Sequence, residues 1–195
     1  AATATWRRAL GLVPRTPAQR LAFARQLAET GWTGGLPPRE TLHHYAREVV
    51  ARIHVLLEKT GRGAEAVPDY QWLIDIAPER LGPYFTLVDL LRENQRYEEL
   101  AEVFQKLVRR LPDDAGVHAG FGSALLKLGR AEKAAGMFAR AAALDPENAY
   151  VLDSLGKACF MAGKAAKGLE ACRAAIEADP AYRAPYEIAD RHLRE

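Results

Sequence analysis

Apolar residues recur at helical spacing through most of the chain, in pairs of stripes that a short turn separates. Residues 115–148 illustrate the pattern, because two stripes flank the turn at Gly129. Apolar positions three or four residues apart share one face of a helix, and a glycine between two such stretches indicates a turn. The pattern predicts a helical hairpin with these two apolar stripes: Phe121, Leu125 and Leu128, then Ala134, Phe138 and Ala141.

The hairpin pattern repeats at a fixed period of 34 residues. Four prolines mark it, since 112 − 78, 146 − 112 and 180 − 146 are all 34, at Pro78, Pro112, Pro146 and Pro180. Three further prolines would fall on this lattice by chance with a probability on the order of 10⁻⁴. The sequence therefore divides into repeats at 47–80, 81–114, 115–148 and 149–182, with a half unit at 183–195.

The repeats also agree residue by residue. Phe121-Gly122 in the third repeat corresponds to Leu155-Gly156 in the fourth, and Phe138 corresponds to Cys172. Gly122 is small where the two helices of a hairpin must approach each other closely. A single hairpin cannot bury both of its stripes, so we expect the units to stack into a right-handed superhelix.

On these residues the chain resembles the tetratricopeptide repeat family, whose 34-residue unit carries a leucine and glycine, a small alanine, a phenylalanine and a closing proline. The resemblance extends over residues 47–195. It implies an all-α fold, an α-solenoid of helical hairpins.

Two departures from the pattern predict local changes. Pro68 lies near the start of the second helix of the first repeat, where proline is tolerated only in the first turn. We expect that helix to start late or to bend. Gln95 stands where the neighbouring repeats carry a turn glycine.

Residues 1–46 do not fit the lattice and are predicted to form a helical capping segment. Thr16-Pro17 is typical of a helix start, and an amphipathic stretch follows as far as Gly31. Repeat arrays need a terminal unit that covers their exposed core. We expect Trp6 and Trp32 to anchor this cap.

Composition and charge exclude several classes of protein. The chain has 195 residues, 49% of them hydrophobic, and a formal net charge of +2. This balance predicts a folded globular protein and provides no field strong enough to indicate a nucleic-acid partner. No stretch is apolar enough for a membrane span. The chain begins at Ala1 and its first methionine is Met137, so we expect its start to result from processing, excision or truncation, and the compartment stays open between cytoplasm, periplasm and secretion.

No residue pattern predicts catalysis, a cofactor or a metal. His44 and Glu48 lie four residues apart beside His43, but two ligands do not make a metal site. Neither serine has a recognisable histidine and carboxylate partner. We expect Cys159 and Cys172 to be buried free thiols, with a disulfide as the alternative in an oxidising compartment.

The resemblance implies a binding groove lined by the first helices of successive repeats. Here these positions alternate small side chains with aromatic ones, which suits a ligand side chain or helix. The predicted partner-binding residues are Arg52, Phe85, Asp89, Arg92, Ala119, Gly120, Ser123, Lys127, Tyr150, Asp153, Ser154 and Lys157.

This groove predicts a non-enzymatic protein interaction module, an adaptor or scaffold that binds a peptide or protein segment. Repeat adaptors that grip the acidic tails of heat-shock chaperones use lysines, asparagines and an arginine. Here the corresponding positions include Val55, Thr86 and Gly116, so we expect no such docking. The alternative is a self-assembling architectural protein, a homo-oligomer formed through the ends of the array.

Overall fold

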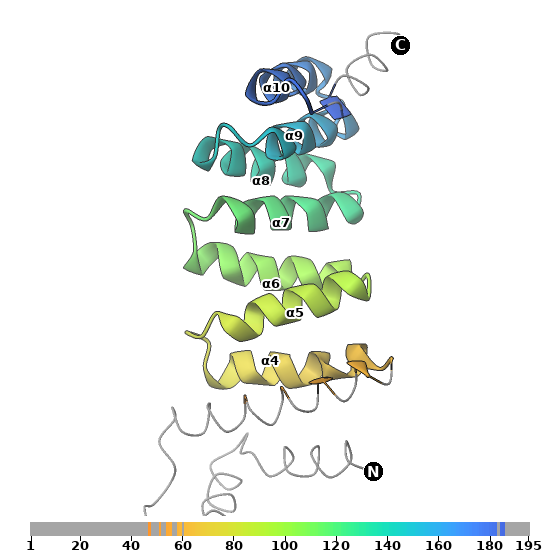
Figure 1. Ribbon diagram of the computed structural model, residues 1–195, viewed down its shortest axis with the longest axis vertical. Helices are drawn as coiled ribbons and strands as arrows, with labels where there is room; N and C mark the ends of the chain where they lie inside the picture. The colour runs from red at the N-terminus through yellow and green to blue at the C-terminus, as the bar shows by residue number, and fades with distance from the viewer. Residues whose placement is uncertain are drawn as a thin grey trace, which may run out of the picture. The chain divides into compact units, whose positions relative to one another are not determined.

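The computed structural model describes residues 61–182, together with residues 47, 51, 54, 55, 58, 59, 184 and 185. The described part contains one 3₁₀ helix, seven α-helices and no strand (Figure 1). This confirms the all-α solenoid fold. In chain order the elements are η1 (Gly63–Ala66), α4 (Val67–Ile76), α5 (Gly82–Glu93), α6 (Tyr97–Arg110), α7 (Ala115–Lys127), α8 (Ala131–Leu144), α9 (Ala149–Met161) and α10 (Ala165–Ala178).

The helix boundaries keep the register of the repeats. Helix α9 starts 34 residues after α7 (149 − 115), and α10 starts 34 residues after α8 (165 − 131). Equivalent polar side chains cap the first helices, because Asp114 accepts a hydrogen bond from the Val117 backbone N–H and Asn148 accepts one from the Val151 N–H. Such caps satisfy backbone donors that have no partner within the helix. The 34-residue period is therefore a period of helix starts as well as of apolar positions.

The turns within the hairpins use one backbone conformation. Gly61, Gly129 and Gly163 have φ angles of 69°, 69° and 72°. Gln95 occupies the same position in its repeat and adopts φ 57°, the only non-glycine residue with positive φ in the described part. This conformation is easy for glycine and costly for residues with a β-carbon. The turn is thus required by the fold even where the sequence does not supply its preferred residue.

Helix α4 starts late, as Pro68 predicts. The second helices of the later hairpins begin at residues 97, 131 and 165, which correspond to residue 63 in the first repeat. Residues 63–66 instead form the 3₁₀ helix η1, and α4 begins at Val67 with Pro68 in its first turn. Proline is accommodated there because its missing N–H would have no helical acceptor.

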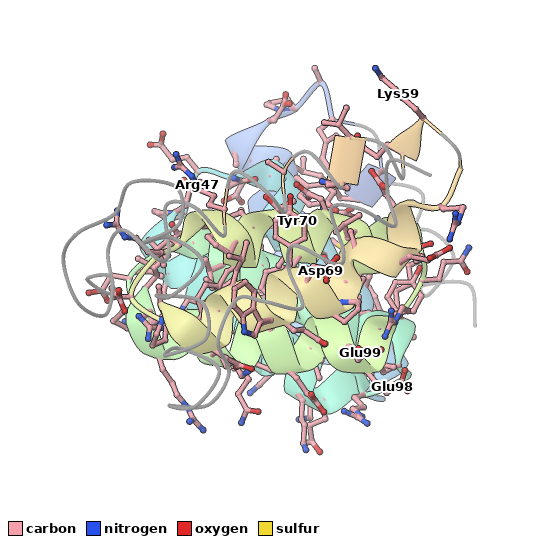
Figure 2. The ribbon with its side chains drawn as sticks, turned by 90° about the horizontal axis from the view of Figure 1, so that it is seen from below. Arg47, Lys59, Asp69, Tyr70, Glu98 and Glu99 are labelled. Carbon is pink, nitrogen blue, oxygen red and sulfur yellow. The ribbon has the colours of Figure 1, made fainter. Side chains whose placement is uncertain are left out.

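The chain divides into two compact units, Ala1–Asn94 and Gln95–Glu195. In the first unit α4 packs against α5, and Leu73, Tyr84 and Leu87 are almost completely buried. His54 Nδ1 lies 3.0 Å from the hydroxyl of Tyr70, which Figure 2 labels on α4. Burial, with the negative charges of Glu58 and Asp69, raises the pKa of Tyr70 to about 12.

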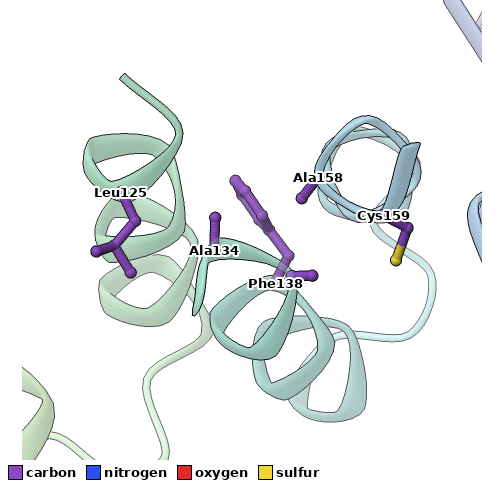
Figure 3. Close-up of a cluster of buried hydrophobic side chains, with 6 residues drawn as sticks. Leu125, Ala134, Phe138, Ala158 and Cys159 are labelled. Atoms are coloured by element: carbon purple, nitrogen blue, oxygen red, sulfur yellow. The ribbon is translucent and has the colours of Figure 1, made fainter. Parts of the chain in front are cut away.

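In the second unit each helix from α6 to α10 packs against the next one in the chain. Figure 3 shows the centre of this core, where Phe138 lies among Leu125, Ala134, Ala158 and Cys159. A β-carbon placed on Gly122 would lie 2.9 Å from two ring carbons of Phe138. The predicted close approach of the two helices at Gly122 is therefore confirmed.

Polar and thiol groups are also packed inside this unit. His118 is buried and its Nε2 lies 2.8 Å from the Pro112 carbonyl oxygen, which it reaches as a donor. Cys159 and Cys172 are buried free cysteines, and burial raises the pKa of both thiols. The expectation of buried free thiols is confirmed.

Several predicted features lie outside the described residues. These are the capping segment with Trp6 and Trp32, the histidine pair at residues 43 and 44, and most of the terminal half unit. No described helix is both long and apolar enough to span a membrane.

Candidate partner-binding surface

The second unit brings two first helices into contact. Helix α7 contacts α9 directly, and α8 packs against both of them. The outward positions of α7 and α9 therefore adjoin. We call this the first-helix surface and define it by its exposed or partly exposed members: Ala119, Ser123, Lys127, Tyr150 and Lys157.

Small side chains dominate the α7 part of this surface. Ala119 and Ser123 are partly exposed, and Lys127 is exposed at the end of the helix. Gly120 belongs to the core instead, because a β-carbon there would lie 2.4 Å from Cζ of Phe104. The missing side chain of Gly120 thus makes room for a ring from α6, and it provides no space for a ligand.

The α9 part of the surface is organised around a buried carboxylate. Asp153 is fully buried, with an exposed fraction of 0%. Its Oδ2 accepts hydrogen bonds from Lys157 Nζ at 2.6 Å and from the Tyr182 hydroxyl at 3.1 Å. Its Oδ1 is buried without a hydrogen-bond partner. Asp153 therefore fixes its two neighbours and is not itself exposed to a partner, and Ser154, at 5% exposed, is buried as well.

Tyr182 was not predicted as part of this cluster. Burial is the main cause that raises its pKa to about 12, followed by the charge of Asp153 and the hydrogen bond to it, with a contribution from nearby Tyr150. The contact between Tyr182 and Asp153 joins residues 29 positions apart, and the repeat register contains no signal for it. Tyr150 itself is the most exposed aromatic side chain in the described part of α9, at 58%.

The first unit holds the remaining predicted residues. Phe85 on α5 is 43% exposed. Asp89 and Arg92 form an exposed ion pair of 3.1 Å one turn further along. Arg52 lies outside the described residues. The structure thus presents Phe85, Asp89 and Arg92 on the surface of α5.

The chemistry of these surfaces suits recognition. They offer exposed rings, small side chains and ion pairs. Among the described residues, no group of three or more histidines, cysteines, aspartates and glutamates is placed to hold a metal ion. The cysteine thiols are buried, and burial disfavours the reactive thiolate.

The fold and the repeat register define the chain as a helical repeat protein. Residues 120–183 match the sequence profile of the tetratricopeptide repeat, and the chain is a tetratricopeptide repeat protein. Proteins of this family are in general non-enzymatic protein-interaction modules. No curated protein matches the whole sequence significantly.

Solved structures confirm the fold. A crystal structure of MamA is 20% identical with a TM-score of 0.65, covering 71% of this chain and 81% of that one. MamA 41-end from Desulfovibrio magneticus RS-1 is 18% identical with a TM-score of 0.58, covering 83% and 96%. The first repeat domain of Spaghetti (RPAP3), solved with the HSP90 peptide SRMEEVD, is 16% identical with a TM-score of 0.53, covering 55% and 85%.

Proposed function

We propose that this chain is an adaptor or scaffold that binds a peptide or protein segment along the first-helix surface. The observation that carries the proposal is the exposure of Tyr150, at 58%, on a helix that contacts the small-sided helix α7. An exposed aromatic ring beside small side chains provides both an anchor and room for the residues of a partner. In the first unit, Phe85 on α5 is proposed to play a similar part.

The charges of the surface indicate which kind of peptide it suits. Lys157 lies 2.6 Å from the buried carboxylate of Asp153, so its positive charge is already balanced within the protein. Asp89 and Arg92 likewise balance each other. A surface whose cations are paired in this way favours a peptide of mixed polar and apolar residues over a strongly acidic one. This differs from the acidic peptide in the Spaghetti complex.

The test is a selection of binding peptides followed by affinity measurements with matched variants. Peptides are selected from a display library on the intact chain, and their dissociation constants are measured by fluorescence anisotropy. Tyr150→Ala is expected to weaken the selected peptides by about tenfold or more, because truncation of a central aromatic anchor commonly costs at least that much. Met161→Ala is the control, since Met161 is 60% exposed at the far end of the same helix.

Two results would count against this proposal. One is an affinity that Tyr150→Ala leaves unchanged while binding itself is specific. The other is self-assembly through the ends of the array, in which case light scattering would show a mass above the 21.5 kDa of one chain and Leu193→Arg would lower it.

A further inference from the structure

A groove lies between the second helices of the second unit, apart from the first-helix surface. It has a volume of about 460 Å³, its walls are α6 and α8, and its floor is α7. Phe121 and Met137 line it and are partly exposed, while Gly136 leaves an open space where a β-carbon would meet no atom within 4 Å. We call it the α6–α8 groove.

The two walls of this groove carry opposite charges. Glu98 and Glu102 lie one turn apart on α6, with Glu98 labelled at the start of that helix in Figure 2. Arg130 and Lys133 line the α8 side. Within the described part of the chain none of these four residues has an ion pair or a side-chain hydrogen bond. An acidic wall and a basic wall thus face one apolar floor.

The repeat register shows that the basic wall departs from the pattern of the earlier repeats. Arg62 pairs with Glu65, and Arg96 pairs with Glu99 at 2.6 Å, in both cases three residues apart. Their equivalents in the third repeat, 34 residues after Arg96 and Glu99, are Arg130 and Lys133. A lysine therefore stands where a glutamate would neutralise the arginine. The positive charge of this wall is left available to a group outside the hairpin.

Other charges around the same helices are satisfied within the protein. Arg140 on α8 forms an ion pair of 3.0 Å with Asp113, and Glu132 on α8 forms one of 2.6 Å with Lys164. The unpaired charges are thus concentrated at the groove. Opposite charges on its two edges fix the orientation of a bound partner and reject partners with the same charge on both edges.

We propose that the α6–α8 groove binds a short amphipathic helix of a partner protein. That helix carries apolar side chains for the floor, basic side chains along the edge that faces Glu98 and Glu102, and acidic side chains along the edge that faces Arg130 and Lys133. Apolar residues of a helix that enter a hydrophobic groove provide affinity, and the flanking charges provide specificity. The groove and the first-helix surface lie on different faces of α7, so this site is additional to the proposed function.

The probe is a labelled, lactam-constrained helical peptide with a leucine stripe, lysines along one edge and glutamates along the other. Two control peptides carry the same leucines with lysines on both edges or glutamates on both edges. The mixed peptide is expected to bind the intact chain about tenfold more tightly than either control, because each control places like charges against one wall. Equal affinities for the three peptides would overturn the proposal.

Two variants at Gly136 test whether the groove is the site. Gly136→Leu fills the open space with an apolar side chain and is expected to weaken the mixed peptide by about tenfold. Gly136→Ala leaves most of that space open and is expected to change the affinity by less than about twofold. Both variants are checked by circular dichroism. Unchanged binding to Gly136→Leu would overturn the proposal.

A charge reversal completes the test. In R130E/K133E both walls are acidic, so the chain is expected to prefer the peptide with lysines on both edges. Loss of mixed-peptide binding in Tyr150→Ala but not in Gly136→Leu would assign the peptide to the first-helix surface and overturn this proposal alone. A dimer in light scattering that Gly136→Leu dissociates would make the occupant a second copy of the chain, which would also overturn it.

Discussion

The ring of Phe138 occupies the place that a side chain of Gly122 would need. A β-carbon on Gly122 would lie 2.9 Å from ring carbons Cδ2 and Cε2. One repeat later, a β-carbon on Gly156 would lie 2.9 Å from the sulfur of Cys172. The same contact between the two helices of a hairpin is thus made by an aromatic ring in one repeat and by a thiol in the next.

Gly122→Ala is expected to destabilise the protein by about 1–2 kcal/mol. The added methyl group overpacks the contact with Phe138, which costs about 1–3 kcal/mol, and the better helix propensity of alanine offsets part of this cost. Chemical denaturation monitored by circular dichroism measures the difference. A variant that is as stable as the original chain would show that the two helices separate at no cost.

Gly136→Ala is expected to have the opposite effect, a stabilisation of about 0.5–1 kcal/mol. Gly136 lies inside α8, yet nothing would contact its β-carbon within 4 Å. Alanine there gains helix propensity and meets no obstacle. The same denaturation experiment compares it with Gly122→Ala, and a loss of stability in both variants would contradict the distinction drawn between the two glycines.

Gln95→Gly is expected to stabilise the chain by about 0.5–1 kcal/mol. The φ angle of Gln95 is 57°, a left-handed conformation that costs a residue with a β-carbon about 1–2 kcal/mol. Part of that gain is lost because glycine is more flexible in the unfolded chain. The thermal midpoint measures the effect, with Gln95→Ala as the control that keeps the β-carbon. A lower midpoint for the glycine variant would rule out strain at this turn.

The contact between Tyr182 and Asp153 is expected to persist to high pH. An unfolded tyrosine has a pKa of about 10, whereas burial and the Asp153 carboxylate raise the pKa of Tyr182 to about 12. Because the folded state favours the neutral phenol, its contribution to stability is complete below pH about 10 and is lost as the pH rises through about 12.

Phenolate absorbance measured against pH tests this expectation. Tyr182→Phe should remove one of the late titrations, and Tyr70→Phe should remove another, since the pKa of Tyr70 is also raised to about 12. Loss of an ordinary titration near pH 10 in the Tyr182→Phe variant would show that Tyr182 does not contact Asp153 in solution.

The sequence by itself determined the order, length and ends of the helices. These follow from local chemistry: apolar spacing, capping by Asp114 and Asn148, turn glycines and the effect of Pro68 on the start of α4. Each of these signals acts within a few residues of the position it controls. The repeat period then carried the same information from one hairpin to the next.

Only the tertiary structure decided what each small or charged residue does. Gly120, Gly122 and Gly136 are the same amino acid, yet Phe104 fills the space at the first, Phe138 fills it at the second, and the third is open. Asp153 was predicted at the surface but is buried under Tyr182 and Lys157. Such differences depend on side chains that reach across from other helices, and the spacing along one helix does not encode which of them will arrive.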